Sequence, residues 1–135
     1  KMALASFQEI LNSVIERFKM QTPIDVKLQY ASAGQDLSPQ QQLQLVFIVQ
    51  EALSNIRKHA KASQVLIDFS HQKDHINLLI RDNGVGFDTA VNKEHHGHHI
   101  GLSIVQGRIA QMQGDMAIES APNHGTSIHV SIHPQ

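Results

Sequence analysis

Three polar side chains recur on one side of the segment QEALSNIRKHA, residues 50 to 60. Glu51, Asn55 and Lys58 are spaced four and three residues apart, so on an α-helix they fall within about 60° of one another. A carboxylate, an amide oxygen and an ammonium on one stripe can hold a hydrated Mg²⁺ and a phosphate chain, because Mg²⁺ prefers oxygen ligands and keeps several waters. Gln44 extends the same stripe, so the pattern also fits the polar side of any half-buried helix.

A second polar segment, RDNGVGFD at residues 81 to 88, follows an apolar run. Asp82 stands where a strand should end, and its carboxylate can accept a hydrogen bond from an exocyclic amine such as that of adenine. Gly84 and Gly86 lack a Cβ and allow the backbone to approach a ligand closely. The alternative interpretation is an ordinary Asn-Gly turn. The segment lacks the third glycine and the βαβ context of a dinucleotide-binding fingerprint, and no P-loop lysine follows a glycine run.

A third segment, KEHHGHHIGL at residues 93 to 102, holds four of the ten histidines. Gly101 precedes an apolar helix whose first N–H groups have no partner within the helix, so this N-terminus is a predicted phosphate site. His95 and His99 have the i, i+4 spacing of a helical metal pair, although the segment has no helical periodicity. A polar loop with incidental histidines is the third interpretation.

The elements that must position these residues follow from apolar periodicity. Ser38 and Pro39 have the types expected at the N-cap and first turn of a helix, and Gly114 is expected to close the last helix. Residues 71–74 are expected to form the turn of a hairpin. The expected helices are residues 3–19, 39–60 and 102–112, and the expected strands are residues 24–30, 65–69, 76–80, 116–118 and 128–132.

This order of elements predicts an α/β fold, a two-layer sandwich in which a mixed sheet packs against helices on one face. A single domain spanning residues 1–135 agrees with the length and with the 41% hydrophobic content. The formal net charge of −1 gives no electrostatic reason to expect nucleic acid. There is no cysteine, which excludes disulfides and cysteine-based zinc sites.

The sequence contains no apolar run long enough to span a membrane. The first given residues do not have the pattern of a signal peptide, so we expect none within this sequence. Because it begins with Lys1 and Met2 inside an expected helix, we expect the chain to be a piece of a longer protein.

In this order along the chain, four segments resemble the nucleotide-binding motifs of GHKL ATPases, the superfamily of gyrase, heat-shock chaperones, histidine kinases and mismatch-repair proteins. ExxxNxxKHA at 51–60 resembles the N box of histidine-kinase ATP-binding domains, and DNGVG at 82–86 resembles their first glycine box. HIGL at 99–102 resembles the second glycine box, and Gly-Thr at 125–126 matches the pair near their end. The Lys-His-Ala sequence and a short lid resemble the nitrate/nitrite-sensor type, although His98 stands where many relatives have glycine.

The resemblance implies the Bergerat ATP-binding fold and a role for each motif residue. Asp82 is expected to accept the adenine amine, with Thr126 nearby through water. Asn55 is expected to bind Mg²⁺, and Glu51 to act through a metal-bound water or as a base. The other residues expected at the nucleotide are Gly84 and Gly86 beside the base, and Lys58, His59, His99, Gly101 and Leu102 along the phosphates.

The implied function is that of the ATP-binding catalytic domain of a two-component sensor histidine kinase. The domain is expected to use ATP and Mg²⁺ and to transfer the γ-phosphoryl group to a histidine on a separate dimerisation domain. We find no such domain in the sequence, so the isolated chain is expected to bind ATP without phosphorylating itself. The expected partners are that dimerisation and phosphoacceptor domain, a response regulator and a second copy in a homodimer.

The longer protein is expected to be a bacterial inner-membrane sensor that carries this domain on its cytoplasmic side. Three alternatives belong to other classes. They are a non-catalytic ATP-sensing module, an anti-sigma-factor-type protein serine kinase, and a metal-binding protein that uses His95 and His99.

Overall fold

The computed structural model describes residues 2–30, 37–72, 74–86 and 100–133. Its helices and strands follow the predicted order, and their ends lie close to the predicted ones. The elements are α1 (Met2–Gln21), β1 (Asp25–Tyr30), α2 (Pro39–Asn55), the π-helical turn η1 (Ile56–Ala60), β2 (Gln64–Gln72), β3 (His75–Asp82), α3 (Ile100–Gln111), β4 (Asp115–Ser120) and β5 (Thr126–Ile132).

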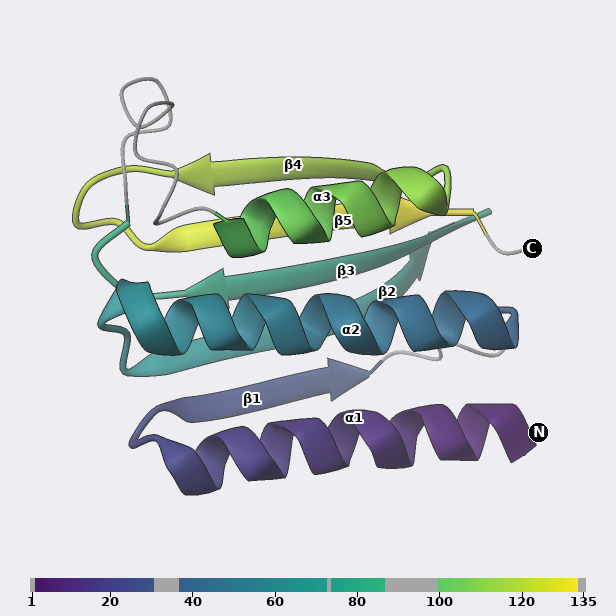
Figure 1. The fold of residues 1–135 in the computed structure, drawn as a ribbon, viewed down its shortest axis with the longest axis horizontal. Helices are drawn as coiled ribbons and strands as arrows, with labels where there is room; N and C mark the ends of the chain where they lie inside the picture. Colours follow the sequence, from purple (N-terminus) through teal and green to yellow (C-terminus); the bar gives the residue numbers. More distant parts are fainter. Residues whose placement is uncertain (1, 31–36, 73, 87–99, 134–135) are drawn as a thin grey trace.

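The strands form one five-stranded sheet in the order β1-β2-β3-β5-β4. The β1 and β2 strands are parallel, as their connection through α2 requires, and all other neighbours are antiparallel. The three helices cover one face of this sheet (Figure 1). The predicted two-layer α/β sandwich with a mixed sheet is therefore confirmed.

The core lies between the helices and the inward-facing side chains of the sheet. Alternate residues of the strands are buried, as the pleat of a strand requires. The buried apolar strand residues are Val26, Val65, Ile67, Phe69, Ile76, Leu78, Ile80, Ile128, Val130 and Ile132. Phe7 of α1 meets Phe69 of β2 edge to face, with ring centroids 5.8 Å apart, which fixes α1 over this part of the sheet.

The N-terminus of α2 is capped as predicted, with Ser38 at the N-cap and Pro39 in the first turn. In this first turn the apolar Leu43 side chain is 54% exposed, while the polar Gln41 and Gln42 are buried. Gln41 completes a capping box, in which its Oε1 accepts from the backbone N–H of Ser38 at 3.1 Å. Gln42 Nε2 donates to a backbone carbonyl oxygen at 3.2 Å. The capping geometry therefore sets the rotation of the first turn and takes precedence over hydrophobicity.

Three predicted details at the ends of elements are wrong. The α-helical winding of α2 stops at Asn55 and continues to Ala60 as a π-turn. The left-handed residue after α3 is Gln113, with φ 58°, rather than Gly114. The N–H groups of Gln113 and Gly114 donate to the carbonyl oxygens of Ala110 and Ile109, both at 3.0 Å, in the pattern of a Schellman motif. The hairpin strands extend to residue 72 and begin again at residue 75, which shortens the turn expected at 71–74.

Candidate functional site

The predicted motifs converge on one end of the sandwich. In Figure 1, α2 ends, β3 ends, and α3 and β5 begin at the left-hand end of the sheet. These elements carry motif residues that are far apart in sequence: Glu51 and Asn55 on α2, Lys58 and His59 on η1, Asp82 on β3, Gly84 and Gly86 after it, Gly101 and Leu102 on α3, and Thr126 on β5. His99 and the alternative metal ligand His95 lie outside the described residues.

Asp82 is the buried polar group at this end. Its side chain follows Ile76, Leu78 and Ile80 on the inward face of β3, and it is only 6% exposed. The Oδ1 atom accepts a hydrogen bond from the backbone N–H of Gly84 at 2.8 Å. Burial raises the pKa of the Asp82 carboxyl above its ordinary value, and hydrogen bonds from the Gly84 and Thr126 backbones oppose that rise.

The Asp82 carboxylate keeps capacity for a further donor. An ionised carboxylate offers about four lone-pair sites, and the two backbone N–H groups occupy two of them. No lysine, arginine or histidine of the described residues forms an ion pair with it. A buried carboxylate without a cationic partner is unfavourable in the empty protein. A ligand that brings an N–H donor would complete this group.

Thr126 is the first residue of β5. It lies directly opposite Asp82 of β3 on one side and opposite Ser120 of β4 on the other. The hydroxyl oxygens of Ser120 and Thr126 are 2.8 Å apart, and Ser120 Oγ also donates to the carbonyl oxygen of Gly125 at 3.0 Å. Since a hydroxyl has one proton, Thr126 is the donor in the first bond. Ser120 thus orients Thr126, a role that the sequence analysis missed. Antiparallel pairing of the last two predicted strands was the signal that could have found it.

Two glycines bring backbone segments into contact around Asp82. A Cβ added at Gly84 would lie 2.1 Å from the carbonyl oxygen of Ala60, the last residue of η1. The same oxygen accepts from the N–H of Val85 at 2.7 Å. At Gly125, with φ 73°, an added Cβ would lie 2.1 Å from the carbonyl oxygen of Asp82. The first glycine box therefore packs directly against the end of the N box.

Asn83 holds this loop from the other side, and the sequence analysis treated it only as part of a turn. Its Oδ1 accepts from the backbone N–H groups of Ser63 and Gln64 at 2.9 and 3.0 Å, and its Nδ2 donates to Ser63 Oγ at 2.9 Å. These bonds join the loop after β3 to the start of β2. Nothing in the local sequence distinguishes this asparagine from one that only enters a turn.

The N box residues divide between two kinds of helix. Glu51 and Asn55 are half-buried on α2, and Lys58 and His59 are exposed on η1. A π-turn has more residues per turn than an α-helix, so the predicted stripe holds from Glu51 to Asn55 and is wrong in extending at the same angle to Lys58. The carboxylate and amide oxygens of the α2 pair are ligands of the type that Mg²⁺ prefers.

Gln44, which the sequence analysis placed on the same polar stripe, makes a contact between helices. Its Oε1 accepts from Arg108 Nη1 of α3 at 3.1 Å. The Arg108 guanidinium also lies 4.5 Å from the ring centroid of Phe47 on α2. This contact fixes α3 beside α2 and so places the start of α3 at the same end of the sheet.

Comparison with known proteins agrees with this geometry. Residues 40–135 match the model of the family described as histidine kinase-, DNA gyrase B-, and HSP90-like ATPase. The signal transduction histidine-protein kinase/phosphatase DegS of Brevibacillus brevis is 36% identical over 122 residues, which are 90% of this chain and 31% of that protein. The nitrate/nitrite sensor protein NarX of Escherichia coli K12 is 28% identical over 126 residues, 93% of this chain and 20% of that protein.

Solved structures share the fold. The histidine kinase AdeS of Acinetobacter baumannii superposes with a TM-score of 0.78 at 15% identity, over 96% of this chain and 65% of that one. The mycobacterial sensor histidine kinase MprB gives a TM-score of 0.70 at 19% identity, over 95% of both chains. The chain spans less than a third of the length of the curated relatives named above. Within the described residues, no helix has the length and apolar character that crossing a membrane requires.

Proposed function

Because the chain belongs to the histidine kinase-, DNA gyrase B-, and HSP90-like ATPase family, we propose that the end of the sheet around Asp82 binds ATP. The domain then serves as the ATP-binding catalytic domain of a two-component sensor histidine kinase. It positions the γ-phosphoryl group for transfer to a histidine nitrogen on a separate dimerisation domain. The observation that carries the proposal is the buried Asp82 carboxylate, which has acceptor capacity left and no cationic partner among the described residues.

The base-binding part of the proposal rests on Asp82 and Thr126. The 6-amino group of adenine supplies the N–H donor that the Asp82 carboxylate lacks. Thr126 donates its hydroxyl proton to Ser120, so toward a ligand or a bridging water it acts as an acceptor. Gly84 and Gly86 let the backbone after Asp82 pack closely against the carbonyl oxygens of Ala60 and Ala121, which supports the site from behind.

The phosphate-binding part rests on the N box and the start of α3. The side-chain oxygen of Asn55 can bind Mg²⁺, and the Glu51 carboxylate can bind it directly or through a water. The ion would neutralise charge on the phosphates during transfer. Lys58 and His59 are exposed beside this position and can contribute positive charge and N–H donors. The roles of His99, Gly101 and Leu102 at the phosphates stay predictions.

The proposal extends to the longer protein. The histidine acceptor, a response regulator and a second subunit are its expected partners, and a bacterial inner membrane is its expected location. The named relatives, a kinase/phosphatase and a nitrate/nitrite sensor, support a signalling role.

The direct test is a calorimetric titration of the 135-residue chain with a nonhydrolysable ATP analogue, with and without Mg²⁺. We expect binding that Mg²⁺ strengthens. Asn55→Ala should remove most of the Mg²⁺ dependence while leaving binding of the base. If Asn55→Ala kept the full dependence, the metal would have to be held elsewhere.

Catalysis needs a second experiment. The separately produced dimerisation domain of the longer protein is mixed with this chain and labelled ATP, and acid-labile, base-stable phosphate is measured on the acceptor. Mg²⁺-dependent phosphohistidine is the expected result. Binding of ATP without any transfer would assign the chain to non-catalytic ATP sensing, and transfer to a serine of a partner protein would assign it to the anti-sigma-factor type.

A further inference from the structure

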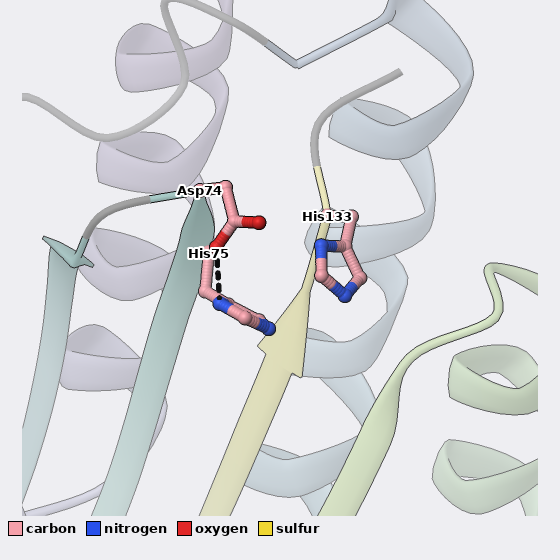
Figure 2. Close-up of side chains that lie close together, drawn as sticks. All are labelled: Asp74, His75 and His133. Carbon is pink, nitrogen blue, oxygen red and sulfur yellow. Dashed lines mark ion pairs between the residues drawn. The ribbon is translucent and has the colours of Figure 1, made fainter.

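Asp74, His75 and His133 meet at the end of the sheet opposite the proposed nucleotide site, and Figure 2 shows their side chains gathered there. Asp74 lies in the turn before β3, His75 begins β3, and His133 follows β5. One possible ligand atom from each residue lies within 4.8 Å of the others. Since β3 rises about 3.3 Å per residue, seven steps place His75 roughly 23 Å from Asp82 along the strand. The cluster is therefore separate from the nucleotide site.

The two histidines are placed by the sheet itself. Each lies one residue beyond the Ile76–Ile132 pair of the antiparallel strands β3 and β5. Their ring centroids are 4.1 Å apart. Residues opposite one another on antiparallel strands have Cβ atoms only about 5 Å apart, so both imidazoles project into one small region. The register that builds the core thus also brings the histidines together.

Two further contacts hold the cluster in place. His75 Nδ1 lies 2.9 Å from Asp74 Oδ1, so the carboxylate and the imidazole already converge. The carbonyl oxygen of His133 accepts from Nε2 of Gln41 at 2.8 Å, and Gln41 is 2% exposed. A buried side chain of α2 therefore fixes the backbone of His133, while the ring stays at the surface.

The donor set has a distinct chemical preference. Imidazole nitrogen suits zinc, copper and nickel, whereas Mg²⁺ selects oxygen. Two histidines and one carboxylate are a known three-ligand combination for zinc, with metal–ligand distances of about 2.0–2.2 Å and a further position open to water. At these metal–ligand distances, tetrahedral ligand atoms lie roughly 3.3 Å from one another. The three residues already place ligand atoms within 4.8 Å, and the Asp74 side chain, which is 76% exposed, has room to rotate closer.

We propose that Asp74, His75 and His133 bind one divalent transition-metal ion of the zinc class, with two imidazole nitrogens and one carboxylate oxygen as ligands. The ion links the turn between β2 and β3 to the end of β5. Because it binds the folded chain and bridges segments that unfolding separates, it raises thermal stability by an amount that grows with the logarithm of the free metal concentration above the dissociation constant. The proposal stands independently of ATP binding.

The test is a zinc titration in a background that removes competing histidines. Four of the ten histidines lie together at positions 95, 96, 98 and 99, so these are first replaced by alanine. Calorimetry of this background chain with ZnCl₂ is expected to give one ion per chain. Adding His75→Ala, His133→Ala or Asp74→Asn should each weaken binding by about tenfold or more. MgCl₂ in place of ZnCl₂ should give no comparable binding.

His129→Ala is the matched control. His129 Nε2 lies 3.3 Å from Glu119 Oε1, so this residue also pairs with a carboxylate on the sheet but belongs to no three-residue cluster among the described residues. We expect it to leave zinc affinity unchanged. Zinc should also raise the melting temperature of the background chain and fail to raise that of its His133→Ala variant. The absence of stoichiometric zinc binding, or equal weakening by His129→Ala and His75→Ala, would overturn the proposal.

Discussion

At one end of β3 the Asp82 carboxylate is buried among backbone N–H groups, whereas at the other end the half-buried His75 begins the strand and Asp74 is exposed in the turn before it. Around Asp82, the end of η1, the end of β3 and the loops after β3 and β4 contact one another. They do so at glycines where an added Cβ would overlap a carbonyl oxygen. Around His75, the register of β3 against β5 brings the residues together, and the Asp74–His75 pair and the bond from Gln41 to the His133 carbonyl oxygen hold them. The region around Asp82 depends on the path of the backbone. The side chains around His75 can be replaced with little effect on the backbone. Mutations should therefore affect the two ends very differently.

The largest expected effect comes from Gly125→Ala at the Asp82 end. The left-handed conformation at φ 73° and a Cβ 2.1 Å from the Asp82 carbonyl oxygen should together lower the free energy of unfolding by about 3 kcal/mol. Urea denaturation measures this loss. The control is Gly107→Ala in α3, where an added Cβ meets nothing within 4 Å and should stabilise by roughly 0.5–1 kcal/mol. Similar values for both variants would remove the claimed dependence on backbone contact.

Asp82→Asn should separate binding from stability at the same end. Loss of the carboxylate acceptor is expected to weaken binding of the ATP analogue by about 1–3 kcal/mol. Burial raises the pKa of Asp82 in the folded chain above its unfolded-state value. The wild type therefore loses folding stability as the pH rises from the unfolded-state pKa, about 3.9, through the folded-state pKa. The loss persists at neutral pH. The uncharged variant should therefore melt at a higher temperature than the wild type at pH 7 without nucleotide. Unchanged nucleotide affinity would overturn the assignment of Asp82.

The same raised pKa predicts a pH dependence of nucleotide binding. Protonation of Asp82 removes an acceptor, so the affinity of the wild type for the analogue should fall on acidification. The fall should begin at a higher pH than an exposed aspartate would give, because burial favours the protonated form. Titrations over a pH series measure this, with Asp82→Asn as the reference. The affinity of Asp82→Asn for the analogue should lack the fall that comes from protonation of Asp82. If the affinities of the two proteins fell in parallel with pH, another group would cause the pH dependence.

Gln41→Ala tests the buried support of the opposite end. The change removes half of the capping box of α2 and the bond to the His133 carbonyl oxygen, and we expect a loss of about 1–2 kcal/mol in unfolding free energy. Replacement of Gln40, an exposed neighbour in the same turn, by alanine is the control and should be close to neutral. Equal effects of the two changes would show that the cap contributes nothing specific.

The smallest effect is expected for His133→Ala without metal. The ring is exposed, and surface substitutions usually change stability by less than about 0.5 kcal/mol. Urea denaturation in the presence of a chelator measures this, and the same variant should lose the stabilisation by zinc. A large loss of unfolding free energy in the presence of the chelator would contradict this expectation. It would mean that the His133 end depends on its side chains as strongly as the Asp82 end depends on its glycines.

The sequence predicted the fold because most elements have strong apolar periodicity. Alternation along residues 65–69 and 76–80 indicated which side chains face the core, and the position of Asp82 at the end of the second strand was predicted, whereas its place on the inward face comes from the structure. The residue types of the neighbouring Ser38 and Pro39 located the start of α2 correctly. These features are local in sequence, so one segment suffices to read them.

The missed features depend on contacts between distant segments. Asn83 binds the start of β2, and Ser120 meets Thr126 only after β4 and β5 pair. The cluster of Asp74, His75 and His133 requires the register of β3 against β5. A propensity scale places a polar Gln41 at the surface, yet its bond to a residue 92 positions away keeps it buried. Long-range pairing is the information that a single sequence lacks.

The π-turn η1 has a consequence for how the length of this chain can vary. A π-turn arises when a helix accommodates one surplus residue, and the surplus here lies between Ile56, which is buried, and Lys61, which adopts the left-handed conformation with φ 52°. Ile56 at its start still belongs to the core, and β2 starts after it. An insertion or deletion at this point would move the Ala60 carbonyl oxygen, which lies against Gly84 and accepts from the N–H of Val85. We therefore expect η1 to keep a fixed length, because that length sets where the loop after Asp82 lies against the end of α2.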